Sequence, residues 1–272
     1  MLFSKYQGTG NDFILLDNRD GVYNSITENV IHHVCNRRFG IGADGLMMLG
    51  NKEGYDFEMK YYNADGKLAS MCGNGGRCIV RFASSLGIQK NVYRFLAADG
   101  VHEAEIDLGG MVRLKMVDVT SVEVHSNYFL LNTGSPHYIK YVTDIMQTDV
   151  PAAGKMIRFS DKFAKEGVNV NFVENLEEDL IYVRTYERGV EDETFSCGTG
   201  VTASALVSAH NDNGFNRVEV KTPGGRLSVE FDKTDENHFE NIWLVGPAEK
   251  VFTGNLTLNM EDFLQPQELL KK

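Results

Sequence analysis

The chain repeats itself, and this repetition constrains its fold more than any other feature of the sequence. Four short motifs of the first half recur in the same order in the second half, at an offset of about 125 residues, which is typical of a duplication. The pairs are TGNDF with TGSPH, GIGAD with EGVNV, MCGNG with SCGTG, and ADG with PGG. We therefore predict two similar halves, residues 1–118 and 119–253, with residues 254–272 joining the first half.

Each half also has the same predicted order of elements. A strand is followed by an amphipathic helix (residues 27–38, and a shorter one near 160–167), further strands, a Cys-Gly turn, a second helix and closing hairpins. The helices after the Cys-Gly turns consist of small and apolar residues on nearly every face, which predicts burial on every side. We predict an α/β (α+β) fold of two similar domains related by a pseudo-two-fold, each a mostly antiparallel sheet curled around a central helix.

Charge and hydropathy exclude several classes of partner. The net charge is −11 and no run of basic residues occurs, so we expect no nucleic-acid partner. No apolar stretch is long enough for a membrane span or a signal peptide, so we expect no membrane association and a cytoplasmic location. In a reducing cytosol the four cysteines are expected to be thiols, and because none of their spacings is CxxC we expect no metal site.

The four cysteines are of two kinds. Cys35 and Cys78 lie in apolar helical segments and are predicted to be core residues. Cys72 and Cys197 each precede a glycine-rich loop that opens a helix, where backbone amides can bind an anion and are expected to lower the pKa of a thiol towards neutrality. Two such thiols on opposite faces of an α-carbon could invert it, one as base and one as acid. This pair therefore predicts a cofactor-independent amino-acid epimerase.

Other polar residues are candidates for the site. Asn63 and Arg188 each lie nine residues before one of these two cysteines, so the duplication places them at equivalent positions, and an arginine there could clamp a carboxylate. His137 in the TGSPH loop could tune a thiol if it lies nearby. The segment GIGADG matches the dinucleotide pattern GxGxxG, but a helix precedes it and a strand follows, which is the reverse of the required context.

On these residues the chain resembles the diaminopimelate epimerase family over nearly its whole length. The motifs that carry the resemblance are GTGNDF, FGIGADG, YYNADG, MCGNGGR, TGSPH, VNVNF, YERG and SCGTG. The resemblance implies a two-domain α/β fold, often dimeric. It also implies interconversion of LL- and meso-2,6-diaminopimelate in lysine and peptidoglycan biosynthesis, without pyridoxal phosphate or metal.

The resemblance also assigns roles by motif. Cys72 and Cys197 would be the acid/base pair, and His137 and Glu187 would tune their thiols. The loops Gly73–Asn74 and Gly198–Thr199 would bind the reacting carboxylate. The remaining substrate contacts would come from Asn11, Asn63, Asn169, Glu187 and Arg188. Two positions depart from the family's pattern, because Ser135 stands where many relatives have Asn and Gly45 where many have Gln.

Three alternatives remain open. Proline racemases and hydroxyproline epimerases share the two-cysteine plan, although they usually have His after the first Cys-Gly, where this chain has Asn74. A thiol redox protein could use Cys72 and Cys197 as a switch, because thiols that flank one carbon must lie close together. A relative of the PhzF-like isomerases could share the fold without the matched thiol pair.

Overall fold

The strands of the two halves pair in the same order. The protein is described by a computed structural model that covers residues 1–209 and 213–258. The elements of the first half are β1 (Leu2–Gly8), β2 (Asn11–Asp17), α1 (Glu28–Cys35), β3 (Gly45–Gly50), β4 (Phe57–Asn63), β5 (Leu68–Ala69), α2 (Gly73–Ser85), β6 (Val92–Ala97), β7 (Gly100–Ile106), β8 (Val112–Lys115) and β9 (Val122–Val124).

The second half repeats this list with one added 3₁₀ turn. Its elements are β10 (Phe129–Asn132), β11 (Pro136–Tyr141), η1 (Ile145–Gln147), α3 (Val150–Arg158), β12 (Asn169–Glu177), β13 (Leu180–Glu187), β14 (Asp192–Thr194), α4 (Gly198–Ser208), β15 (Gly214–Thr222), β16 (Gly225–Lys233), β17 (Phe239–Gly246) and β18 (Glu249–Asn255). In both halves the second strand pairs parallel with the third and the fourth pairs parallel with the sixth, while the other pairings are antiparallel. The predicted α/β fold of two similar, mostly antiparallel halves is confirmed.

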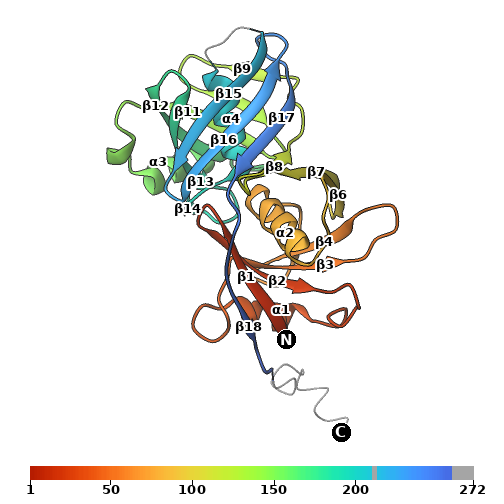
Figure 1. The fold of residues 1–272 in the computed structure, drawn as a ribbon. Coiled ribbons are helices and arrows are strands. Elements are labelled where there is room, and N and C mark those ends of the chain that lie inside the picture. Colours follow the sequence, from red (N-terminus) through yellow and green to blue (C-terminus); the bar gives the residue numbers. More distant parts are fainter. Residues whose placement is uncertain (210–212, 259–272) are drawn as a thin grey trace.

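The two halves exchange their last strands. β9 pairs antiparallel with β10, the first strand of the second half, and β18 pairs antiparallel with β1, the first strand of the first half. A further antiparallel pairing between β8 and β17 joins the two sheets (Figure 1). Neither half therefore completes its sheet without a segment of the other.

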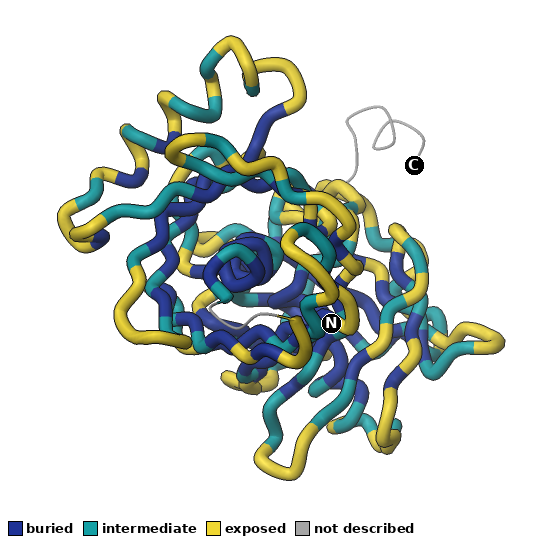
Figure 2. Tube along the Cα trace, turned by 90° about the horizontal axis from the view of Figure 1, so that it is seen from above, coloured by how far each residue is buried: buried dark blue, intermediate teal, exposed yellow. Residues whose placement is uncertain are grey.

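Each sheet curls around its own central helix. Figure 1 places α2 inside the lower half and α4 inside the upper half, and Figure 2 shows the helix of the upper half nearly end-on within a ring of strands. One continuous apolar core contains residues of both helices, such as Ile79 and Val201, and Leu244 of β17 between the halves. Two smaller cores cover the outer faces of the sheets, under α1 and under α3.

The outer helices begin at ordinary side-chain caps. Thr27 accepts a hydrogen bond from the amide of Val30 at the start of α1, and Asp149 accepts one from Ala152 at the start of α3. The central helices α2 and α4 have no side-chain cap, and their N-cap residues are Cys72 and Cys197. The thiol groups therefore stand where the other two helices have a hydroxyl or carboxylate cap.

Some expectations need correction. The short helix predicted near residues 160–167 is wrong, because that segment forms consecutive turns and the helix lies earlier, at Val150–Arg158. Asp149 followed by Pro151 in the first turn is the start signal that the prediction overlooked. The boundaries of the halves stay a prediction. The repeated order of elements puts β9 in the first half although it lies beyond the expected limit at residue 118, and β18 crosses the expected limit at residue 253. Residues 259–272 of the expected closing segment lie outside the described residues.

Within residues 1–209 and 213–258, no helix has the length and hydropathy that crossing a membrane requires.

The halves also meet at a tight turn contact that can be tested. A Cβ atom on Gly224, in the turn before β16, would collide with the backbone carbonyl oxygen of Thr9 in the first half. We expect Gly224→Ala to lower the free energy of unfolding by about 1–3 kcal/mol, because backbone cannot move aside as a flexible side chain can. Urea denaturation measures this change, with Gly50→Ala as the control, since the nearest atom to a Cβ there is 3.9 Å away. Equal denaturation midpoints for the two variants would contradict the expectation.

Candidate active site

The N-termini of the two central helices meet at the junction of the halves. A Cβ atom on Gly73 would lie 3.4 Å from the Cα atom of Gly198, and one on Gly198 would lie 3.2 Å from the Cα atom of Gly73. Leu244 packs against both glycines. This contact brings Cys72 and Cys197, the residues immediately before the two helices, to one place, with both backbones extended.

Both thiols are affected by burial and by helix amides in opposite directions. Burial raises the pKa of Cys72 and of Cys197, and hydrogen bonds from first-turn amides, those of Gly75 and Asn74 on one side and Gly200 on the other, lower it. The expectation that the amides bring the thiols towards neutrality is wrong for this structure, because burial is the larger effect. Glu187 raises the pKa of both thiols further, and Cys72 raises that of Cys197. The pair therefore resists carrying two negative charges.

Asn11 and Asn74 surround Cys72. The Sγ atom of Cys72 lies 3.6 Å from Oδ1 of Asn11, and Nδ2 of Asn74 lies 3.4 Å from the same oxygen. Nδ2 of Asn11 donates to the carboxylate of Asp44 at 2.5 Å, which fixes the amide so that its oxygen faces the thiol. Asn74 also donates to the carbonyl oxygen of Ser196, beside the other cysteine. Cys72 thus faces a hydrogen-bond acceptor.

Thr199 has the equivalent place beside Cys197, but with a hydroxyl group. Its Oγ1 atom lies 3.4 Å from Sγ of Cys197 and 3.1 Å from Oγ of Ser135. Ser135 in turn lies 2.9 Å from Nε2 of His137 and accepts a hydrogen bond from Nδ2 of Asn169 at 3.1 Å. His137 is therefore connected to the thiol through two hydroxyl groups and not directly.

His137 is fully buried, and burial lowers its pKa to about 3, with a smaller contribution from the charge of Arg188. Its Nδ1 atom lies 3.0 Å from Nδ2 of Asn171. The same Nδ2 donates to the backbone carbonyl of Tyr138, which identifies it as the donor end of the amide. His137 is consequently a neutral imidazole whose hydrogen is on Nε2.

The remaining predicted contacts lie where β4 and β13 end. Glu187 accepts a hydrogen bond from Thr194 at 3.0 Å, and burial raises the pKa of its carboxyl group. The backbone amide of Arg188 donates to Oδ1 of Asn169, and its guanidinium donates to the carbonyl of Glu166. Asn63, at the equivalent exit from β4, is exposed. The structure thus places Glu187 near both thiols and leaves Arg188 and Asn63 exposed beyond the strand ends.

Gly45 leaves no space for a longer side chain. A Cβ atom at this position would meet the ring of Tyr61 and the carbonyl of Tyr62. Tyr61 is buried, and burial together with the nearby Cys72 raises the pKa of its hydroxyl group. The Tyr61 ring therefore occupies the space next to residue 45.

Arg77 is a further residue of the site that the sequence analysis did not predict, although it lies within the motif MCGNGGR. It is fully buried in α2, and it donates to the carbonyls of Gly73 and Pro247 and to the side chains of Thr9 and Asn74. Burial lowers its pKa to about 10, so it stays cationic at neutral pH. Among the described residues it forms no salt bridge. A buried cation without a carboxylate partner favours an anionic ligand nearby.

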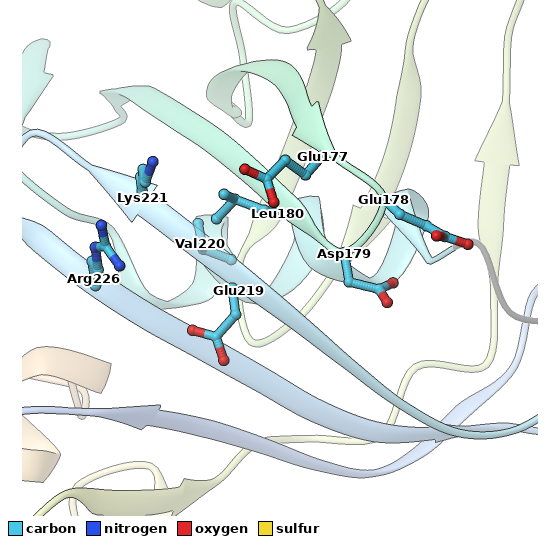
Figure 3. A pocket seen from close by; sticks show the side chains of 8 residues that line it. All are labelled: Glu177, Glu178, Asp179, Leu180, Glu219, Val220, Lys221 and Arg226. Carbon is cyan, nitrogen blue, oxygen red and sulfur yellow. The ribbon is translucent and has the colours of Figure 1, made fainter.

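A surface pocket of about 400 Å³ lies away from these residues, at the β12–β13 turn and β15. Its lining mixes four acidic side chains with Lys221 and Arg226 (Figure 3). It contains no cysteine and none of the predicted site residues. In the part of the chain that the structure describes, no group of His, Cys, Asp and Glu side chains is arranged to hold a metal ion.

Comparisons with known proteins agree with one another. A family model described as "Diaminopimelate epimerase" matches residues 3–122 and 129–251. A diaminopimelate epimerase of Flavobacterium psychrophilum is 47% identical over 93% of this chain and 98% of its own, and one of Chlorobaculum tepidum is 43% identical over 92% and 99%. The crystal structure of a PhzF-family phenazine biosynthesis protein of Bacillus anthracis is 12% identical, with a TM-score of 0.74 over 95% of this chain and 99% of that one, and shows the same fold.

The buried neutral His137 predicts a specific dependence of stability on pH. Because its folded pKa lies below the ordinary value near 6.5, the unfolded chain binds a proton there that the folded chain does not, and stability falls as pH is lowered from about 6.5 towards about 3. We expect His137→Gln to flatten the slope of unfolding free energy against pH between pH 6 and 4 by up to about 1.4 kcal/mol per unit. Urea titrations at several pH values measure the slope, with His32→Gln as the exposed control. An unchanged slope in His137→Gln would mean that His137 is charged in the folded protein.

Proposed function

Because this chain belongs to the diaminopimelate epimerase family, we propose that it interconverts LL- and meso-2,6-diaminopimelate with Cys72 and Cys197 as the acid/base pair. The observation that carries the proposal is the contact between Gly73 and Gly198, which brings two uncapped helix N-termini and their cysteines together. The chain is thus an isomerase of amino-acid biosynthesis, in the lysine and peptidoglycan pathway.

The reaction removes a proton from one face of the α-carbon and adds a proton to the opposite face. The thiolate of one cysteine takes the α-proton from one face, and the thiol of the other gives its proton to the opposite face. One sulfur gains a proton and the other loses one, so the atoms and charges balance; the pair is then set for the reverse reaction, and proton exchange with water returns it to its first state. Since a negative charge on one sulfur raises the pKa of the other, a thiolate at one cysteine favours the thiol form at its partner, and the two together are one base and one acid.

Developing charge on the substrate is stabilised by groups of both halves. The reacting carboxylate lies against the first-turn amides of the loops Gly73–Asn74 and Gly198–Thr199. Those amides stabilise the negative charge that moves onto the carboxylate as the α-proton leaves. The buried charge of Arg77, which donates to Gly73 and Asn74, supports the same anion from behind the first loop. No pyridoxal phosphate or metal enters this proposal.

The distant end of the substrate carries a second ammonium and a second carboxylate. We assign the remaining substrate contacts to Asn11, Asn63, Asn169, Glu187 and Arg188. Arg188 can form a bidentate pair with the second carboxylate, and Glu187 can accept from an ammonium group. The exposure of Arg188 and Asn63 supports this role, because their side chains are open to a ligand.

The alternatives fit less well. The substrate of a proline racemase or hydroxyproline epimerase has no second charged end for Arg188 to bind. Asn74 also stands where those families usually have His. A redox role for the two cysteines has no support beyond their proximity, and both are free thiols. We further propose a cytoplasmic homodimer, which rests on the family resemblance alone.

The substrate assignment is tested by supplying the purified protein separately with LL-diaminopimelate and with L-proline. We expect conversion of the first to the meso isomer, followed by chiral chromatography, and no racemisation of the second. Turnover of proline alone would overturn the proposal.

The acid/base assignment is tested by Cys72→Ala and Cys197→Ala. Each variant should lose at least about 100-fold in kcat because an acid or base is missing, while circular dichroism stays unchanged. Cys35→Ala, at a buried thiol of the outer core, is the matched control and should keep its activity. Full epimerisation by either active-site variant would rule out the two-base scheme.

A further inference from the structure

Ser135 is the residue that stands where many relatives have Asn, and its hydroxyl group lies at the centre of a hydrogen-bond network. Its Oγ atom contacts Nε2 of His137 at 2.9 Å, Nδ2 of Asn169 at 3.1 Å and Oγ1 of Thr199 at 3.1 Å. A hydroxyl group has one hydrogen to donate and can accept two. The direction of each bond therefore decides what Ser135 does.

Ser135 must accept two of the three hydrogen bonds. Backbone groups fix the orientation of the neighbouring amide side chains, and this orientation decides which partners of Ser135 are donors. The backbone amide of Arg188 donates to Oδ1 of Asn169, so the other end of that amide, Nδ2, faces Ser135 as a donor. The carbonyl of Tyr138 accepts from Nδ2 of Asn171, so this nitrogen also donates to Nδ1 of His137. The hydrogen of the neutral imidazole is then on Nε2, which donates to Ser135.

The only hydrogen of Ser135 is therefore directed to Thr199. Oγ1 of Thr199 accepts it, and the hydrogen of Thr199 points to Sγ of Cys197 at 3.4 Å. We propose that Ser135 is a positioning residue that orients the Thr199 hydroxyl group so that it donates its hydrogen to the sulfur of Cys197. This role deepens the proposed function, on which its importance for turnover rests.

The arrangement serves Cys197 alone. Asn11, whose orientation is fixed by Asp44, presents an oxygen to Cys72, which is an acceptor and not a donor. Donation to a sulfur favours its thiolate form, whereas an acceptor favours the thiol form. Ser135 thus acts on one of the two sulfurs only.

The charged and titratable groups around Cys197 come from three elements. Glu187 at the end of β13 and Cys72 before α2 both disfavour its thiolate, and His137 on β11 is neutral. The Thr199 hydroxyl group is thus a neutral donor that offsets part of these effects, together with the amide of Gly200. Its loss should be visible as a change in the titration of Cys197.

The experiment measures the pKa of Cys197 from the pH dependence of its alkylation by iodoacetamide, read by mass spectrometry at that residue. The background is Cys72→Ala, so that one active-site thiol titrates, and no substrate is present. We expect Ser135→Ala to raise the apparent pKa of Cys197 by about half to one unit, and Thr199→Val by about one unit or more, a tenfold loss of thiolate at fixed pH. Thr199→Ser keeps a hydroxyl group and should restore most of the effect.

Coupling between the two hydroxyl groups is the sharper test. If Ser135 acts through Thr199, Ser135→Ala should add nothing to the shift caused by Thr199→Val. In the opposite background, Cys197→Ala, the pKa of Cys72 should be unaffected by Ser135→Ala. Ser208→Ala, which removes another buried hydroxyl group paired with Tyr141, is the folding control.

Three results would overturn the proposal: an unchanged pKa of Cys197 in Ser135→Ala, additive shifts in the double variant, or an equal shift of Cys72. Since the readout is a thiol pKa measured without substrate, it stays valid if the protein does not act on diaminopimelate. Failure of the proposed function and failure of the role of Ser135 are therefore distinguishable.

Discussion

The close approach of Gly73 and Gly198 is the contact on which the rest of the site depends. A Cβ atom at Gly73 or Gly198 would lie 3.4 Å or 3.2 Å from the opposite Cα atom and close to Leu244, so glycine lets the two helix backbones come this near without displacing a neighbour. Helix N-termini carry partial positive charge, so two of them facing each other repel unless an anion lies between. The fold places this repulsion at the point where we propose that the substrate carboxylate binds, and the same geometry presents one thiol from each half.

The duplicated backbone is symmetric, but the side chains on it are not. Asn74 and Thr199 occupy the same position of the two helices, and one contacts an amide oxygen while the other contacts a serine hydroxyl group. Arg77 gives the first helix a buried charge, while the equivalent Thr202 only bonds to its own helix, at the carbonyl of Gly198. Two similar half-sites therefore hold their cysteines in different environments. Such a difference suits a reaction whose two substrates, the LL and meso isomers, are diastereomers and not mirror images of each other.

Much of the fold could be predicted from the sequence because the duplication gives each element a second copy against which its pattern can be compared. The order of elements along each half, the two central helices and the special position of Cys72 and Cys197 all follow from local patterns that occur twice, whereas the pairing of the strands does not. The helix at Val150–Arg158 was misplaced because the matching segments there share no motif. The thiol pKa was misjudged because amide donors are visible in the sequence and burial is not. The contacts of Ser135 and Arg77 were out of reach, since they join residues that lie far apart in the chain or depend on which way an amide faces.

The exchange of terminal strands has a consequence for synthesis on the ribosome. β1 is made before every other strand described here, and its antiparallel neighbour β18 is made only at Glu249–Asn255. Throughout translation the first half thus has an open sheet edge that can pair with a nascent neighbour. Contacts of such long sequence separation also form slowly, because the loop that they close is long. The sheet of the nascent first half therefore stays incomplete until a strand encoded almost 250 codons later has been made, and during that time it is exposed to association with neighbouring chains.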